Sequence, residues 1–183
     1  LALALLLCCG AAFAQDDAVV MSATRDPAKK SYNKMMEGAS VFEARRKELA
    51  PNAALRFKLI PRKPDASLDN VRIRVEADTT VIPLEVAPDR TLTIERAPTA
   101  LKEHADVTPN RKAGTMTWRA DVRTPGLPRD VRRLGDLRLE CEVGMKAGLI
   151  SNYPKGFWGW LDQQISQNPS YCRRDTPRYL FFA

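Results

Sequence analysis

The chain has 183 residues, of which 28% are charged and 44% hydrophobic, and its formal net charge is +7. This composition excludes a wholly disordered chain, because it supplies enough apolar residues for one domain with a buried core. A single histidine, His104, excludes zinc sites built on several imidazoles, and catalysis by a nucleophile–histidine pair would depend on that residue alone. We therefore expect His104 to be an exposed loop residue, and we expect no metal site and no cofactor.

The first feature along the chain is an unbroken apolar run over residues 1–14, which ends in Ala12-Phe13-Ala14 and is followed by Gln15-Asp16-Asp17. This pattern is typical of a secretory signal peptide and its cleavage site, and the run is too short to span a bilayer. We interpret it as a signal peptide that lacks its charged start. A lipoprotein cut before Cys8 or Cys9 fits less well, because no small residue precedes either cysteine. The sequence thus predicts an exported protein, periplasmic or secreted, whose mature chain has no transmembrane span.

A helix is predicted over Asp26–Leu49. Asp26-Pro27 is typical of a helix start, and Ala50-Pro51-Asn52 of a helix end. Between them, apolar residues recur at spacings of three and four and form one stripe: Tyr32, Met35, Met36, Ala39, Phe42 and Leu49. Gly38 weakens the middle and can divide the segment into two shorter helices. We assign residues 15–52 to an N-terminal tail and an amphipathic helix.

From residue 55 onward the hydrophobic period changes from 3.6 to 2, which indicates half-buried strands. Six such segments lie at residues 55–59, 71–77, 82–86, 91–95, 116–122 and 137–143. Pro83 makes the third of them an edge strand or a bulged strand. The sequence therefore predicts a mainly β fold, an antiparallel β-sandwich with an immunoglobulin-like or transthyretin-like outline, over residues 53–145.

Residues 146–183 are predicted to form an aromatic-rich extension that is itself truncated, because its end at 178–183 resembles an unfinished strand. Cys141 faces the core in the predicted strand, and two cysteines in an exported domain most often form one disulfide, here Cys141–Cys172. Trp158 and Trp160 form a candidate platform for stacking sugar rings. The alternative is that they cover the end of the core.

The stretch from Arg111 to Arg138 holds eight basic and three acidic residues, and thus +5 of the net charge of +7. We expect its binding residues to be Arg129, Arg132 and Arg133, and its partner to be an anionic envelope component or a partner protein. The alternative is a solvated surface. Export argues against a nucleic-acid partner.

Two acidic or nucleophilic patterns in the sequence resemble catalytic sites. Glu140 and Glu142 share the outward face of the predicted strand, at a separation that suits an inverting glycosidase, but outward acids usually pair with arginines on adjacent strands. Ser31-Tyr32-Asn33-Lys34 matches the S-x-x-K motif without its S-D-N or K-T-G partners. We assign no catalytic residue.

No family is recognised from motifs. The leading functional hypothesis is a non-enzymatic exported envelope protein that binds an anionic partner through its basic stretch. Two alternatives stay open. One is a hydrolase acting on envelope polysaccharide, and the other is a structural subunit that completes a sheet with a partner chain.

Overall fold

The chain folds around two antiparallel sheets, as seen in a computed structural model that describes residues 24–128, 130–149 and 172–173. One sheet has four strands in the order β1-β6-β3-β4, and the other has three in the order β5-β2-β7. The strands are β1 (Lys30–Ser31), β2 (Ala54–Pro61), β3 (Ile73–Glu76), β4 (Val81–Leu84), β5 (Thr91–Leu92), β6 (Asp106–Pro109) and β7 (Met116–Arg123). The prediction of a mainly β chain with antiparallel sheets is confirmed, whereas the sandwich type and the domain limits stay predictions.

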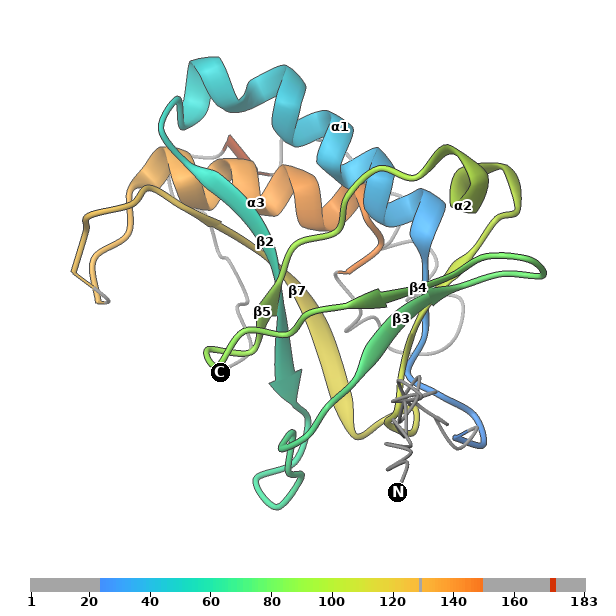
Figure 1. Ribbon diagram of the computed structural model, residues 1–183. Helices are drawn as coiled ribbons and strands as arrows, with labels where there is room; N and C mark the ends of the chain where they lie inside the picture. The colour runs from blue at the N-terminus through green and yellow to red at the C-terminus, as the bar shows by residue number, and fades with distance from the viewer. Residues whose placement is uncertain (1–23, 129, 150–171, 174–183) are drawn as a thin grey trace, which may run out of the picture.

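Two long helices, α1 (Tyr32–Leu49) and α3 (Leu134–Lys146), lie side by side along one end of the sheets, and a short helix, α2 (Pro98–Lys102), lies beside the start of α1 (Figure 1). Helix α1 begins at Tyr32 and not at Asp26, because Ser31 caps it. The Ser31 hydroxyl accepts a hydrogen bond from the Lys34 backbone N–H at 3.4 Å.

Gly38 does not divide α1, which runs unbroken to Leu49. Its role lies in packing. A Cβ atom at Gly38 would lie 2.8 Å from Cβ of Ala147 and 3.0 Å from the carbonyl oxygen of Val143. The missing side chain lets α1 approach the C-terminal end of α3 more closely than any other residue would allow.

The strand predicted over residues 137–143 is wrong, because these residues form the middle of helix α3. Their alternation of apolar and charged residues resembles a half-buried strand. Glu140 and Glu142 are nevertheless 2% and 6% exposed. The alternation fails as a guide to burial here because both acids face arginines inside the fold.

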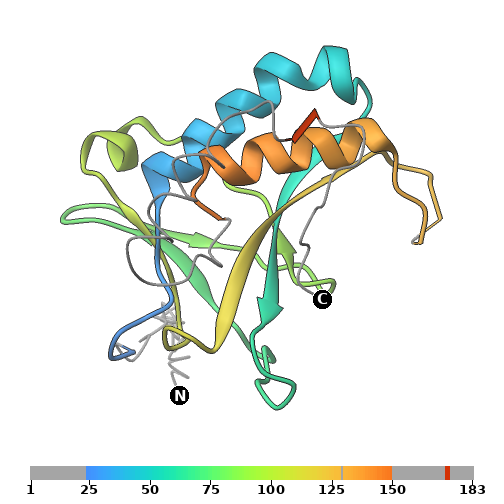
Figure 2. The ribbon, with the colours of Figure 1, turned by 180° about the vertical axis from the view of Figure 1, so that it is seen from behind.

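The other predicted strands are found, with shorter limits for those at 71–77, 82–86 and 91–95. β4 is an edge strand, as Pro83 indicated. β1 and β6 were missed, because each is short and β6 follows a polar segment. The core takes side chains from both sheets and from α1, whose positions relative to one another are seen from behind in Figure 2. Its largest fully buried side chains are Trp118, Tyr32, Phe57, Met35 and Leu59.

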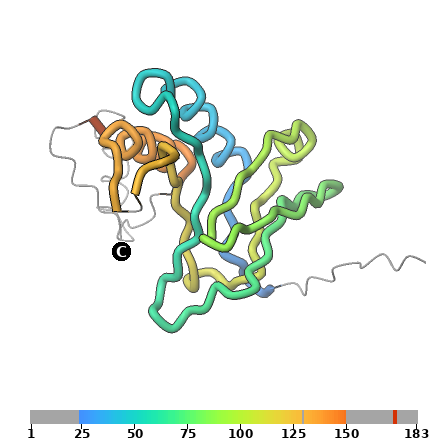
Figure 3. Tube along the Cα trace, turned by 60° about the vertical axis from the view of Figure 1, so that its left-hand side comes forward, coloured from blue at the N-terminus to red at the C-terminus, as the bar shows by residue number. Residues whose placement is uncertain are grey.

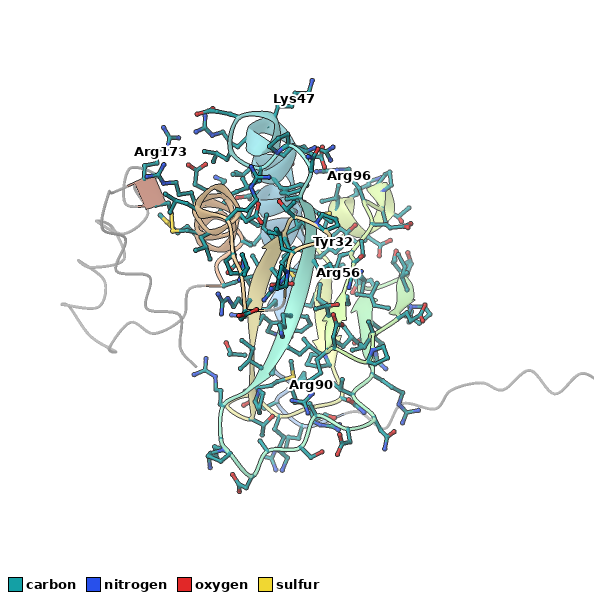
Figure 4. The ribbon with its side chains drawn as sticks, turned by 90° about the vertical axis from the view of Figure 1, so that its left-hand side faces the viewer. Tyr32, Lys47, Arg56, Arg90, Arg96 and Arg173 are labelled. Atoms are coloured by element: carbon teal, nitrogen blue, oxygen red, sulfur yellow. A yellow bond between two sulfur atoms is a disulfide. The ribbon has the colours of Figure 1, made fainter. Side chains whose placement is uncertain are left out.

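Cys141 and Cys172 lie at disulfide-bonding distance, with their Sγ atoms 2.07 Å apart. Residue 173 follows directly, and Arg173 Nε lies 3.0 Å from Glu142 Oε1. In Figure 4 Arg173 lies on the side of α3 that faces away from β2. The predicted signal peptide (residues 1–14), Arg129, Trp158 and Trp160 lie outside the described residues. Within the described ranges, no helix has the length and apolar character needed to cross a membrane.

Candidate functional site

The segment that joins β7 to α3, residues 124–133, is held at its first residue by a carboxylate of α3. Asp136, which is 1% exposed, accepts hydrogen bonds from the Thr124 backbone N–H and the Thr124 hydroxyl, both at 2.9 Å. Asp136 also lies in the first turn of α3, where the helix dipole favours a negative charge. The beginning of the segment is therefore fixed to the beginning of the helix that follows it.

A second carboxylate of α3, that of Glu140, holds the other end of the segment. Its Oε2 accepts hydrogen bonds from the Val122 backbone N–H at 3.0 Å and from Arg132 Nη2 at 2.6 Å. Its Oε1 accepts from Arg119 Nε at 3.1 Å and Nη2 at 2.7 Å. Arg132 also donates to the Val122 carbonyl oxygen at 3.0 Å. Both oxygens of a buried carboxylate are thus used, and its charge faces two guanidinium groups.

The match between helix and strand spacing explains why the two acids meet alternate strand residues. Residues four apart on a helix are separated by about 6 Å along its axis. Residues two apart on a strand are separated by about 6.7 Å. Asp136 and Glu140 can therefore bond to Thr124 and Val122 at the same time. Since β7 is an edge strand, α3 covers the polar groups that β7 would otherwise expose.

The fixed segment presents apolar side chains to solvent. Leu127 is 38% exposed, Val131 43%, and Leu134 at the start of α3 49%. Within the described part of the chain only one other large hydrophobic residue is classed as exposed, Val81 at 63%. Arg133 is exposed beside them, and so is Asp130. We call Leu127, Val131, Arg133 and Leu134 the loop surface.

The loop surface stands out from the body of the protein. A backbone hydrogen bond from Val131 N–H to the Pro128 carbonyl oxygen, at 3.1 Å, closes a turn within the segment. In both ribbon views the segment extends outward beyond the end of β7 and the start of α3 (Figures 1 and 2). The exposed side chains of Leu127 and Val131 lie on this segment, and that of Leu134 lies where it joins α3.

The predicted basic binding residues differ in their exposure and in their contacts. Arg133 is exposed, whereas the Arg132 side chain is 18% exposed and is bound to Glu140 and Val122. Arg119 and Arg123 also pair internally, with Glu140 and with Asp121 at 3.1 Å. Three of the eight basic residues between Arg111 and Arg138 thus pair with the buried acids Glu140 and Asp121. Charge alone pointed to this segment, but the apolar residues between its prolines and arginines were a second signal that sequence reasoning missed.

The expectation that Glu140 and Glu142 share one outward face is also wrong. Two residues apart on a helix, they point in different directions. Glu140 faces β7, whereas the Glu142 carboxylate contacts Arg173 at 3.0 Å and Arg45 of α1 at 3.4 Å. The two carboxyl groups therefore do not face a common space, and the geometry of a two-carboxylate hydrolase is not formed by this pair.

The residues of the S-x-x-K motif and His104 take part in contacts that stabilise the fold. The Ser31 hydroxyl caps α1, and Lys34 Nζ lies 3.0 Å from Glu37 Oε2. The hydrogen bond from Lys34 holds the pKa of Glu37 below its ordinary value. His104 is exposed, and its Nδ1 lies 3.1 Å from Nδ2 of Asn33. Lys34 is thus paired with Glu37, and His104 contacts an amide side chain.

No protein-family model, curated protein or solved structure matches this chain significantly. Function must therefore be inferred from the geometry described above. Among the described residues, Leu127, Val131 and Leu134 of the loop surface combine exposure with apolar character, and they lie in or next to a segment that is held at both ends.

Proposed function

We propose that this protein is an exported, non-enzymatic binding protein that docks reversibly on anionic lipid headgroups of a cell envelope through its loop surface. The observation that carries the proposal is the concentration of exposed apolar side chains. Three of the four large hydrophobic residues classed as exposed in the described chain lie within one short segment, at Leu127, Val131 and Leu134. Scattered exposed hydrophobic residues are ordinary, but a contiguous group marks an interaction surface.

The charge of the chain supports an anionic target. The formal net charge is +7, and Arg133 is exposed between the apolar residues of the loop surface. Basic residues at an anionic lipid surface contribute about 1 kcal/mol each. Apolar side chains that enter the boundary between headgroups and acyl chains supply the rest of the binding energy. The predicted signal peptide and the Cys141–Cys172 pair fit an oxidising compartment outside the cytosol.

The expected binding free energy favours weak and reversible docking. Burying a whole Leu or Val side chain is worth about 1.5–3 kcal/mol, and these three are already half buried, so each contributes about 1 kcal/mol. With the contribution of Arg133, the total is about 4 kcal/mol, which corresponds to dissociation constants near 1 mM. The ion pairs of Glu140 fix the loop backbone in advance, which limits the entropy lost on docking.

The test is co-sedimentation with vesicles at several concentrations of lipid. We expect the protein to bind phosphatidylglycerol-containing vesicles, and to bind pure phosphatidylcholine vesicles more weakly. The triple variant Leu127→Ser, Val131→Ser, Leu134→Ser should lose about 100-fold in partitioning, as three lost contributions of about 1 kcal/mol imply. Val81→Ser is the matched control, since Val81 is more exposed but lies outside the loop surface. Equal loss in the control, or full binding by the triple variant, would contradict the proposal.

A further inference from the structure

A groove of about 490 Å³ lies between β4 of one sheet and β5 of the other, on a different surface from the loop surface. Both strands lie at the ends of their sheets. The floor of the groove is apolar and includes Val75, Ile82, Leu84 and Leu92, of which Ile82 and Leu84 are half-buried. This volume falls within the range of protein binding sites. The tube view shows the β3–β4 arm standing apart from β2 (Figure 3).

The register of β4 leaves backbone groups directed away from β3. The Ala77 N–H donates to the Thr80 carbonyl oxygen at 2.9 Å, which makes residues 77 and 80 a hydrogen-bonded pair. Hydrogen-bonded and non-hydrogen-bonded pairs alternate in an antiparallel ladder, so Val75 and Ile82 form the next hydrogen-bonded pair. The backbone polar groups of Val81 and Pro83, which alternate with the hydrogen-bonded residues of β4, therefore point away from β3. Val81 offers an N–H and a carbonyl there, whereas Pro83 offers a carbonyl alone.

The outer edge of β5 also directs backbone groups away from its neighbouring strand. Leu59 N–H donates to the Arg90 carbonyl oxygen at 2.9 Å, so residues 91 and 93 direct their backbone groups away from β2. The Thr91 groups are already used, by Asp89 and by Ala87 N–H. Thr93, one residue beyond β5, is exposed and lines the groove.

The charged side chains at the groove are Arg56 with its partner Asp89, Arg96, Glu85 and Glu95, and their formal charges sum to −1, opposite in sign to the net charge of the chain. Arg56 is held by Thr91 Oγ1 at 3.1 Å and Asp89 at 3.5 Å, and Arg96 by Ser40 Oγ at 2.8 Å. Figure 4 shows both arginines on the side of β2 away from Arg173. Glu85 and Glu95 also line the groove and are exposed, and neither forms an ion pair with another described residue.

One wall of the groove is fixed from behind by α1. The hydroxyl of Tyr32, a residue with 0% exposure, donates to the Glu95 carbonyl oxygen and accepts from the Ala97 N–H, both at 2.7 Å. The segment that carries Glu95 and Arg96 is thereby held against the helix. The groove is built into the fold and does not depend on a loose loop.

We infer that this groove binds an extended cationic segment of polypeptide, which adds as a strand between β4 and β5. Its backbone would pair with Val81, Pro83 and Thr93, and its apolar side chains would cover Ile82 and Leu84. Its lysine or arginine side chains would face Glu85 and Glu95. Strand addition of this kind takes affinity from main-chain hydrogen bonds and specificity from alternate side chains. The added strand would join the two sheets into one.

The test uses a fluorescent synthetic nonapeptide of alternating valine and lysine, measured by fluorescence anisotropy against the full chain. We expect saturable binding. The double variant Glu85→Gln, Glu95→Gln should weaken it about fivefold, as the loss of two exposed ion pairs implies. The matched control is Glu43→Gln, Glu48→Gln, which removes the same charge from the exposed face of α1 and should leave the affinity unchanged.

A second peptide separates strand pairing from simple charge attraction. The same sequence with alternate backbone nitrogens methylated keeps its charge but loses half of its N–H donors, and it should bind about tenfold more weakly. Binding of the unmethylated peptide should also slow amide hydrogen exchange at Val81 and Thr93. Equal binding of the two peptides, or no effect of the Glu85 and Glu95 changes, would overturn the inference. A dimer that dissociates on Glu85→Arg would also overturn it, because a second copy would then fill the groove.

Discussion

The carboxylate of Glu140 on α3 accepts a hydrogen bond from the backbone N–H of Val122 on β7, over 3.0 Å. A helix side chain thus takes the place that a further strand would have at this sheet edge. The same carboxylate binds Arg132 at the far end of the β7–α3 segment. One acidic residue therefore both closes a sheet edge and fixes the loop surface on which the proposed docking depends.

Replacing Glu140 by Gln should lower the free energy of unfolding by about 3–5 kcal/mol. The change removes the negative charge that faces Arg119 and Arg132 in a site where Glu140 is 2% exposed. Urea denaturation measures the effect. Glu43→Gln, at a residue whose side chain is 69% exposed, is the control and should change stability by less than about 0.5 kcal/mol. A loss below about 1 kcal/mol for Glu140→Gln would show that the cluster is not needed for the fold.

Gly135→Ala should destabilise the protein by about 3 kcal/mol. A Cβ atom at Gly135 would lie 1.9 Å from the carbonyl oxygen of Leu49, a backbone atom that cannot move alone. Gly38→Ala should cost less, because its nearest contact is the Cβ atom of Ala147 at 2.8 Å, and the gain in helix propensity, about 1 kcal/mol, offsets part of that contact. Thermal unfolding of the two variants gives the order directly. The packing account is wrong if Gly38→Ala proves the more damaging change.

The sequence predicted the parts of the fold in which apolar residues are buried and polar residues are exposed. Alternation located β2 and β7, and Pro83 placed β4 at an edge. The strand predicted at residues 137–143 was wrong, because Glu140 and Glu142 are buried against partners from distant positions in the sequence. Arg119 and Arg45 are among these partners. No local pattern encodes such pairings.

Only part of the candidate site could be predicted from the sequence, for a related reason. A surplus of arginine drew attention to residues 111–138, but whether an arginine is exposed depends on which acids the fold brings to it. Arg132 and Arg133 are neighbours in sequence, yet one is bound within the cluster and the other is exposed. The groove between β4 and β5 could not be predicted, since it exists only once two sheets are placed side by side.

The contribution of Asp89 to the free energy of unfolding should be lost on acidification below pH 3.8, the ordinary pKa of an aspartate. Hydrogen bonds from the Thr91 hydroxyl and backbone N–H, together with Arg56, lower the pKa of Asp89. A group whose pKa is lower in the folded state stabilises the fold above its unfolded pKa, and that contribution disappears as the pH falls through the folded value. Asp89→Asn should therefore flatten the acid limb of a stability–pH profile. An unchanged limb would remove Asp89 from this account.

The Cys141–Cys172 pair should resist thiol-labelling reagents in the native protein until a reductant is added. The two residues are 31 apart in sequence, and closing a loop of that size stabilises a fold by about 3–4 kcal/mol in the chain-entropy description. The variant with both cysteines replaced by Ser should lose a similar amount of stability. Mass spectrometry locates the label in the sequence, and label on Cys141 and Cys172 in unreduced native protein would contradict the bond.

The central claim is that the loop surface enters the headgroup region of an anionic membrane. The most direct measurement places an environment-sensitive fluorophore at Val131→Cys, and in a separate sample at Val81→Cys, and records emission as phosphatidylglycerol vesicles are added. The account predicts a blue shift at position 131 and none at position 81. A shift at position 81 alone, or binding to vesicles with no shift at position 131, would contradict it.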